Sequence, residues 1–176
     1  MSPAEPASAL SLAELAHWTA RFADEVRQGL HEVQADPAER WHVRLHEDDD
    51  VDVWLISWTT EQGTELHDHG GSSGAFTVVE GTLTETTWSG GLQQTPGRLV
   101  DHERGEGDSV AFGPHYVHDV RNHGEEVAVS VHAYSPPLRL MNYYDATATG
   151  LLRWASSWTD DPEAPSPERP SERRAS

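Results

Sequence analysis

Short alternating strands, separated by turn residues, constrain the fold of this chain more than any other feature. From about residue 40 to residue 144, polar and apolar side chains alternate with a period of two, and Gly, Pro and Asp interrupt the pattern repeatedly. Successive side chains of a strand point to opposite faces of a sheet, so this pattern is typical of an antiparallel β-barrel or sandwich. The predicted strands are 41–46, 51–59, 75–80, 82–88, 109–112, 118–122 and 127–134.

The segments on either side of this region follow different patterns. Residues 8–30 carry apolar side chains at helical spacing, with Ser11 and Glu14 as a potential capping box and Gly29 near the end. Residues 160–176 contain no Val, Leu, Ile or aromatic residue, which predicts a disordered tail. We therefore expect a helical segment at 1–39 that packs on the barrel, one barrel domain at 40–158 and a tail at 159–176.

The composition excludes several classes of function. The formal net charge is −18, which argues against nucleic acid and anionic membranes as partners. Cys is absent, so disulfides, thiol nucleophiles and cysteine metal sites are excluded. Lys is absent too, which removes Schiff-base chemistry and the P-loop lysine. Without an apolar run of membrane-spanning length or a signal peptide pattern, we expect a cytoplasmic protein, and the acidic surface favours a monomer.

Three histidines form a candidate metal site. His67 and His69 are separated by one residue, so on a strand their side chains project side by side, about the spacing that one ion needs. His118 follows a Gly-Pro turn and can come from a neighbouring strand of the same barrel. His115 is an alternative third ligand, although the spacing of its block favours His118. A hydrogen-bonded histidine cluster without metal is the alternative to a metal site.

A second polar group lies on the predicted strand at 127–134. Alternation places the apolar residues Val127, Val129, Val131 and Ala133 on one face of that strand and the polar residues Ser130, His132 and Tyr134 on the other. Polar groups on one face of a buried strand are costly unless they bond to each other or to a ligand. The two interpretations are a structural network and a relay in which His132 orients the Tyr134 hydroxyl toward oxygen or substrate.

These blocks resemble the two cupin motifs, and in particular the cysteine dioxygenase type I family of the cupin superfamily. The resemblance rests on residues 66–69, on the Gly-Thr-Leu-Thr-Glu-Thr run at 81–86, and on residues 130–137, which look like that family's Ser-x-His-x-Tyr-Ser-Pro-Pro signature. It covers roughly residues 40–145. It implies a mainly β, jelly-roll-like cupin barrel and one Fe(II) per chain. The implied iron ligands are His67, His69 and His118.

Position 74 departs from the general cupin pattern. General cupins carry a Glu ligand five residues after the second His, and this chain has Gly74 there. Three neutral imidazoles leave the full 2+ charge on the ion, which favours an anionic ligand from the substrate, such as a thiolate. Many animal members of the family have a Cys at this position, cross-linked to the active-site Tyr. This chain resembles the bacterial members, which would use Tyr134 unmodified.

The resemblance implies oxidation of a small thiol by O₂ to a sulfinic acid, with Ser130, His132 and Tyr134 as catalytic residues. Arg44 looks like the residue that holds the substrate carboxylate, and a guanidinium can do so through two parallel hydrogen bonds. Related enzymes for 3-mercaptopropionate tend to have Gln there, so Arg44 favours L-cysteine. Arg139 is an alternative carboxylate partner, and a surface role for Arg44 is another.

Other functions also remain open from the sequence. The substrate could be another small thiol, either 3-mercaptopropionate or cysteamine. The site could belong to a different metal-dependent cupin, for instance an isomerase or a dioxygenase acting on carbon, because three imidazoles suit Ni, Mn and Zn as well as Fe. The barrel could also be a cupin that binds a ligand without catalysis.

Overall fold

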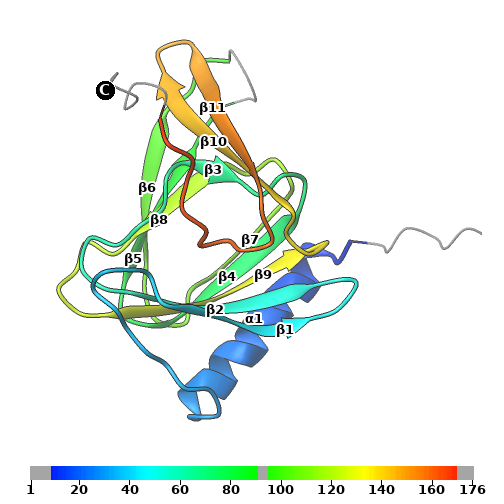
Figure 1. The fold of residues 1–176 in the computed structure, drawn as a ribbon, viewed down its shortest axis with the longest axis vertical. Coiled ribbons are helices and arrows are strands. Elements are labelled where there is room, and N and C mark those ends of the chain that lie inside the picture. The colour runs from blue at the N-terminus through cyan, green and yellow to red at the C-terminus, as the bar shows by residue number, and fades with distance from the viewer. Residues whose placement is uncertain (1–8, 91–94, 170–176) are drawn as a thin grey trace, which may run out of the picture.

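Two antiparallel sheets face each other and form the barrel (Figure 1). The computed structural model describes residues 9–90 and 95–169. Within them, a five-stranded sheet has the order β1-β2-β9-β4-β7, and a six-stranded sheet has the order β11-β10-β3-β8-β5-β6. The strands are β1 (His42–Glu47), β2 (Asp52–Trp58), β3 (His67–Asp68), β4 (Ser73–Glu80), β5 (Leu83–Trp88), β6 (Leu99–Arg104), β7 (Ser109–Phe112), β8 (His118–Arg121), β9 (Ala128–Ser135), β10 (Leu140–Thr147) and β11 (Gly150–Trp158). The predicted mainly β barrel is confirmed.

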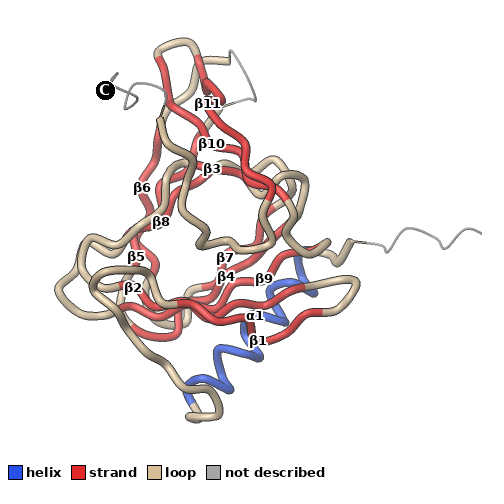
Figure 2. Tube along the Cα trace, in the orientation of Figure 1, coloured by secondary structure: helices blue, strands red, loops and turns tan. Residues whose placement is uncertain are grey.

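The predicted N-terminal helix is also confirmed, as α1 (Leu12–Arg27). The capping box is present: Ser11 Oγ accepts from the Glu14 amide, and the Glu14 carboxylate accepts from the Ser11 amide. Gly29 follows the helix with a positive φ of 75°, which glycine adopts without strain. Figure 2 shows α1 on the side of the five-stranded sheet that faces away from the second sheet. Within the described residues, no helix has the length and apolar character needed to cross a membrane.

Strand β9 separates the helix from the barrel interior, as its alternation predicts. Val129, Val131 and Ala133 belong to the apolar cluster that contains the buried face of α1. On the opposite face, Tyr134 belongs to the interior cluster, together with Trp58 of the neighbouring strand β2. The polar face of β9 therefore lines the inside of the barrel.

Four strands were absent from the sequence-based prediction: β3, β6, β10 and β11. Strand β3 has two residues, too few for a periodic signal. In β11, Leu152 and Trp158 are exposed by 58% and 81%, so the strand does not bury one apolar face. It pairs with β10 along its length, from Leu140 opposite Trp158 to Thr147 opposite Gly150. Backbone pairing between these two segments, and not side-chain alternation, defines the hairpin.

Residues 159–169, which we call the strap, follow β11 and contact the barrel. The sequence predicts disorder here, but carboxylates of the strap pair with basic side chains on and beside β1. Arg169 closes the strap at its other end by pairing with Glu65 and Asp145. The segment runs across the middle of Figure 1, in orange to red. Charge complementarity therefore holds a segment that has no apolar core of its own. The predicted disorder at 170–176 lies outside the described residues.

Candidate metal centre

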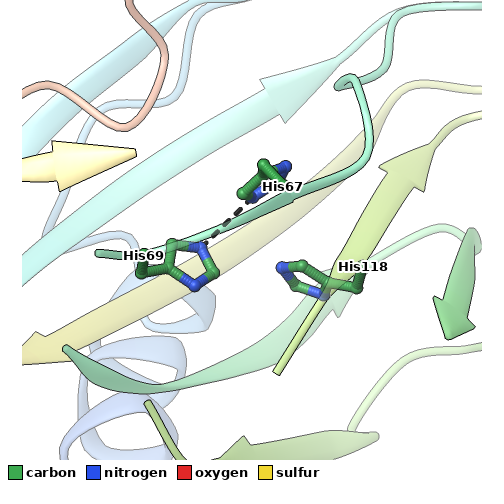
Figure 3. A group of neighbouring side chains, drawn as sticks. All are labelled: His67, His69 and His118. Atoms are coloured by element: carbon green, nitrogen blue, oxygen red, sulfur yellow. Dashed lines mark hydrogen bonds between the residues drawn. The ribbon is translucent and has the colours of Figure 1, made fainter. Parts of the chain in front are cut away.

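His67, His69 and His118 converge inside the barrel, and all three are buried (Figure 3). His67 of β3 lies directly opposite His118 of β8 in the antiparallel register, so both side chains project to the same face. His69 follows two residues after His67, where the chain turns at Gly70 with a positive φ of 58°. A side chain at Gly70 would collide with the backbone of Leu140, so the turn that places His69 requires glycine.

The three rings are grouped closely enough to be candidate ligands of a single ion. One ligand nitrogen from each ring lies within 4.8 Å of the others. The Nε2 atoms of His67 and His69 are 3.2 Å apart. Two nitrogens that each lie about 2.1 Å from one ion are separated by roughly 3.0 to 3.4 Å at octahedral or tetrahedral angles. A separation of this size also suits a hydrogen bond, so the orientation of the rings has to distinguish the two interpretations.

Two of the rings are oriented by hydrogen bonds on their outer nitrogens. His67 Nδ1 donates to the Glu65 carbonyl at 2.6 Å, and His118 Nδ1 donates to Glu85 Oε1 at 2.9 Å. With the proton fixed on Nδ1, the Nε2 lone pair of each ring points toward the common centre. Metal-binding histidines are held in this way, so the arrangement favours a metal site over a histidine cluster.

Glu85 is the centre of a buried network behind His118. Its side chain is fully buried, and it accepts hydrogen bonds from Tyr116, from Arg104 through two nitrogens, and from His118. Burial raises the pKa of Glu85, but the hydrogen bond and charge of His118 and the donors Tyr116 and Arg104 outweigh it and lower this pKa to about 2. The carboxylate is therefore ionised, and the His118 imidazole separates it from the candidate metal site.

Asp68, between the first two histidines, points away from them and holds the turn. Its carboxylate accepts from the Tyr144 hydroxyl at 2.6 Å, from the Asn142 amide at 2.9 Å and from the backbone of Gly70. Tyr144 and Asn142 both lie on β10, next to β3 in the sheet. This network ties the histidine-bearing turn to the hairpin that the sequence did not reveal.

Burial favours the neutral form of His67 and His69, which is the form that binds a metal. Burial, followed by the charge of His118, lowers the pKa of His67 to about 3. The same two influences, burial and neighbouring histidines, hold the pKa of His69 well below its usual value. At neutral pH these imidazoles carry free lone pairs, and their burial makes the protonated forms unfavourable.

Position 74 has no room for a carboxylate side chain that could act as a fourth ligand. A Cβ atom on Gly74 would lie 2.6 Å from the Phe112 ring and 3.1 Å from Tyr134. The rings of Phe112 and Tyr134 also pack against His69, with centroids 5.2 Å and 4.8 Å away. The space that a Glu side chain occupies in general cupins is therefore filled by aromatic rings, and the site keeps three imidazoles.

The polar face of β9 carries a short chain of hydrogen bonds that does not reach Tyr134. Trp58 Nε1 donates to Ser130 Oγ at 2.9 Å, and Ser130 Oγ lies 2.8 Å from His132 Nε2. Burial, followed by the charge of His118, lowers the pKa of His132 to about 3, so its ring is neutral. Among the described residues, none accepts a hydrogen bond from the Tyr134 hydroxyl. The predicted contact between His132 and Tyr134 is not formed, and Tyr134 remains available to a ligand.

The predicted carboxylate partners lie outside the cavity that contains His67. Arg44 lies over the Trp54 ring, 4.6 Å from its centroid, and pairs with Glu47 and Asp160. Arg139 lines a separate surface hollow beside Glu47. His115, the alternative ligand, is exposed and is not part of the three-histidine group.

The cavity that contains His67 has a volume of about 190 Å³. Its lining includes Arg40, Tyr143 and Met141, together with strap residues Pro162 and Ala164. Arg40 was not singled out from the sequence, because a lone Arg in a loop before a strand carries no periodic signal. Glu85 could have been found: Leu83 and Glu85 share one face of their strand, and Leu83 is an interior residue.

The sequence profile of the family described as "Cysteine dioxygenase type I" matches residues 31–147. The chain belongs to the cysteine dioxygenase type I family. The resemblance drawn from the sequence is thereby confirmed, and the protein is a metal-dependent cupin of the thiol dioxygenase kind.

Solved structures share the fold. A protein from Thermus thermophilus is 15% identical, with a TM-score of 0.50, and the match covers 59% of this chain and 90% of that chain. A sugar phosphate isomerase from a cupin superfamily, from Silicibacter pomeroyi, is 20% identical with a TM-score of 0.50, covering 72% of this chain and 80% of that chain. At this level of identity the likeness concerns the cupin fold alone.

Proposed function

We propose that this protein is an Fe(II) thiol dioxygenase that converts L-cysteine and O₂ into cysteine sulfinic acid. The observation that carries the proposal is the set of three buried imidazoles at a site where Gly74 leaves no room for a carboxylate. The overall change is R–SH + O₂ → R–SO₂H, in which sulfur is oxidised and both oxygen atoms are bound to it. When bound, the ion supplies the Lewis acidity that deprotonates the thiol and the redox capacity that O₂ requires.

The protein contributes a dry, neutral pocket around this chemistry. His67, His69 and His118 hold the ion without adding negative charge, so a substrate thiolate is favoured. Phe112 and Tyr134 pack on His69 and exclude water from that side of the site. The low dielectric strengthens the interactions between the site and a charged substrate.

Tyr134 acts as a hydrogen-bond donor in this proposal. Burial, followed by the charges of Glu163 and Asp52, holds the pKa of Tyr134 well above its usual value, so its hydroxyl keeps its proton. A protonated hydroxyl beside His69 can donate to an oxygen atom that gains charge during the reaction. Ser130 and His132 lie on the same face of β9 as Tyr134, where they are hydrogen-bonded to each other, and Ser130 also accepts from Trp58.

The substrate carboxylate would bind on the β1 side of the site, where two arginines lie. Arg44 is the residue expected from the sequence, and to bind a carboxylate there it would exchange Asp160 or Glu47 for the substrate. Arg40 lies at the same side and lines the cavity with His67. Either guanidinium could hold the carboxylate in two parallel hydrogen bonds.

The test is O₂ uptake by the purified, iron-loaded protein with cysteine, 3-mercaptopropionate and cysteamine. We expect uptake with cysteine and a product that carries two oxygen atoms from ¹⁸O₂. His118→Ala should abolish metal binding and uptake together. His115→Ala is the matched control, because this exposed histidine lies three residues earlier and should leave both unchanged. Full iron occupancy without uptake for any of the three thiols would exclude the proposal.

A further inference from the structure

Three acidic side chains of the strap pair with three basic side chains on or just before β1. Asp160 lies 3.2 Å from Arg44, Asp161 lies 3.1 Å from His42, and Glu163 pairs with Arg40. The three pairs differ in depth. The side chains of Asp160 and Asp161 are exposed by 62% and 37%, but that of Glu163 is exposed by 4%. The Glu163–Arg40 pair is therefore the innermost contact of the strap.

This pair lies beside a cavity that reaches one of the three histidines, His67. Arg40 lines that cavity together with His67, and the residues on either side of Glu163, Pro162 and Ala164, line it as well. Arg40 also donates to the Gly63 carbonyl and lies over the Trp58 ring, 5.6 Å from its centroid, so its guanidinium is fixed in place. A carboxylate of the protein itself thus pairs with a fixed guanidinium that lines the same cavity as His67.

We propose that Arg40 receives the carboxylate of the thiol substrate, and that Glu163 occupies this guanidinium until the substrate displaces it. The strap is then an internal competitor that selects thiols carrying a carboxylate over thiols without one. The inference rests on the proposed function for the identity of the substrate. Glu163 accepts a hydrogen bond from Arg40 Nε, and a substrate carboxylate would bind the same guanidinium, so the side chain of Glu163 and the substrate compete for it.

The energetics favour a strap that can be displaced. Burial raises the pKa of Glu163 in spite of the Arg40 charge, so the ion pair does not fully offset the desolvation of the carboxylate. The other ion pairs of the strap, which involve Asp160, Asp161 and Arg169, are formed by partly exposed groups, and such ion pairs contribute little. A substrate that is also held through its sulfur has an advantage over Glu163, because its two contacts act together.

The first experiment uses the unmodified, metal-loaded protein without O₂. Amide hydrogen exchange of residues 160–169 is followed with 3-mercaptopropionate, which has a carboxylate, and with cysteamine, which has none. We expect faster exchange in the strap with 3-mercaptopropionate and no change with cysteamine. Equal effects of the two ligands, or none with either at saturation, would overturn the proposal. This readout needs neither turnover nor a variant.

The second experiment measures anaerobic dissociation constants for Glu163→Gln and for its matched control Asp160→Asn. If the strap is docked about nine-tenths of the time, Glu163→Gln should tighten the binding of 3-mercaptopropionate on the order of tenfold and leave cysteamine unchanged. Arg40→Gln should weaken the binding of 3-mercaptopropionate and leave that of cysteamine unchanged. Asp160→Asn removes the equivalent carboxylate from Arg44 and should leave the dissociation constants of both ligands unchanged.

The outcomes separate this inference from the proposed function. If Asp160→Asn and Arg44→Gln alter carboxylate binding but Glu163→Gln and Arg40→Gln do not, Arg44 is the anchor and the inference is wrong. If no thiol is oxidised but 3-mercaptopropionate still releases the strap, the dioxygenase assignment fails and the Glu163–Arg40 competition stands. If both variants bind the two ligands alike, the Glu163–Arg40 pair is structural only, and the inference also fails.

Discussion

Replacing Glu85 by Gln should weaken metal binding without altering any metal ligand. The Gln side chain keeps the shape of Glu but loses the charge that accepts from His118 Nδ1 at 2.9 Å and from Arg104 at 2.8 and 2.9 Å. Removing a carboxylate behind a metal-binding imidazole typically costs about 10- to 100-fold in affinity. This corresponds to roughly 1.4 to 2.7 kcal/mol at 1.36 kcal/mol per tenfold change.

The same variant should lower the stability of the metal-free protein. Breaking a buried ion pair costs about 3 to 5 kcal/mol when one charge stays buried alone. Arg104 is exposed by 25%, so water compensates part of this loss, and we expect a value near the lower end, about 3 kcal/mol. Urea unfolding of the metal-free protein measures this quantity separately from the metal.

Arg104→Gln separates the two effects. It removes the guanidinium but leaves the Glu85–His118 hydrogen bond, so it should cost stability while metal affinity stays close to that of the unmodified protein. Affinity is measured by competition with a chromophoric chelator at one pH. If Glu85→Gln binds metal as tightly as the unmodified protein, or if Arg104→Gln weakens metal binding equally, Glu85 does not position His118 and the reasoning is refuted.

Three further predictions follow from single contacts. Tyr134→Phe should reduce turnover on the order of 100-fold with metal content unchanged, as measured by O₂ uptake and metal analysis, because a protonated donor is lost; unchanged turnover would exclude a catalytic hydroxyl. Gly74→Ala should cost about 1 to 3 kcal/mol in urea unfolding, since the new Cβ would lie 2.6 Å from Phe112; equal stability would show that the ring moves freely. Burial raises the pKa of Asp52 to about 6. Ionising this buried carboxylate therefore lowers the free energy of unfolding as pH rises from about 4 through 6. Asp52→Asn should therefore gain stability relative to the unmodified protein over that range, by up to about 3 kcal/mol, and a pH-independent difference would contradict this.

Much of the fold and part of the site follow from local patterns in the sequence. The alternation on β9 separates Val129 and Val131 from Ser130 and His132, and the structure has this division. The capping box of α1 is equally local, since Ser11 and Glu14 satisfy each other within one turn. Strands that bury one face, and helices with a local capping box, can therefore be predicted from neighbouring residues in the sequence.

The sequence by itself determined the barrel, the helix and the three candidate ligands, because alternation, capping and the spacing of His67 and His69 are all short-range properties. Only the tertiary structure decided which groups surround those ligands. Glu85 meets His118 through the pairing of β5 with β8, and Glu163 meets Arg40 across more than a hundred residues of chain. Such contacts depend on register and on charge complementarity between distant segments, and neither leaves a periodic trace in the chain. The strap shows this most clearly, because its composition is typical of disorder, yet its carboxylates pair with basic side chains on or just before β1.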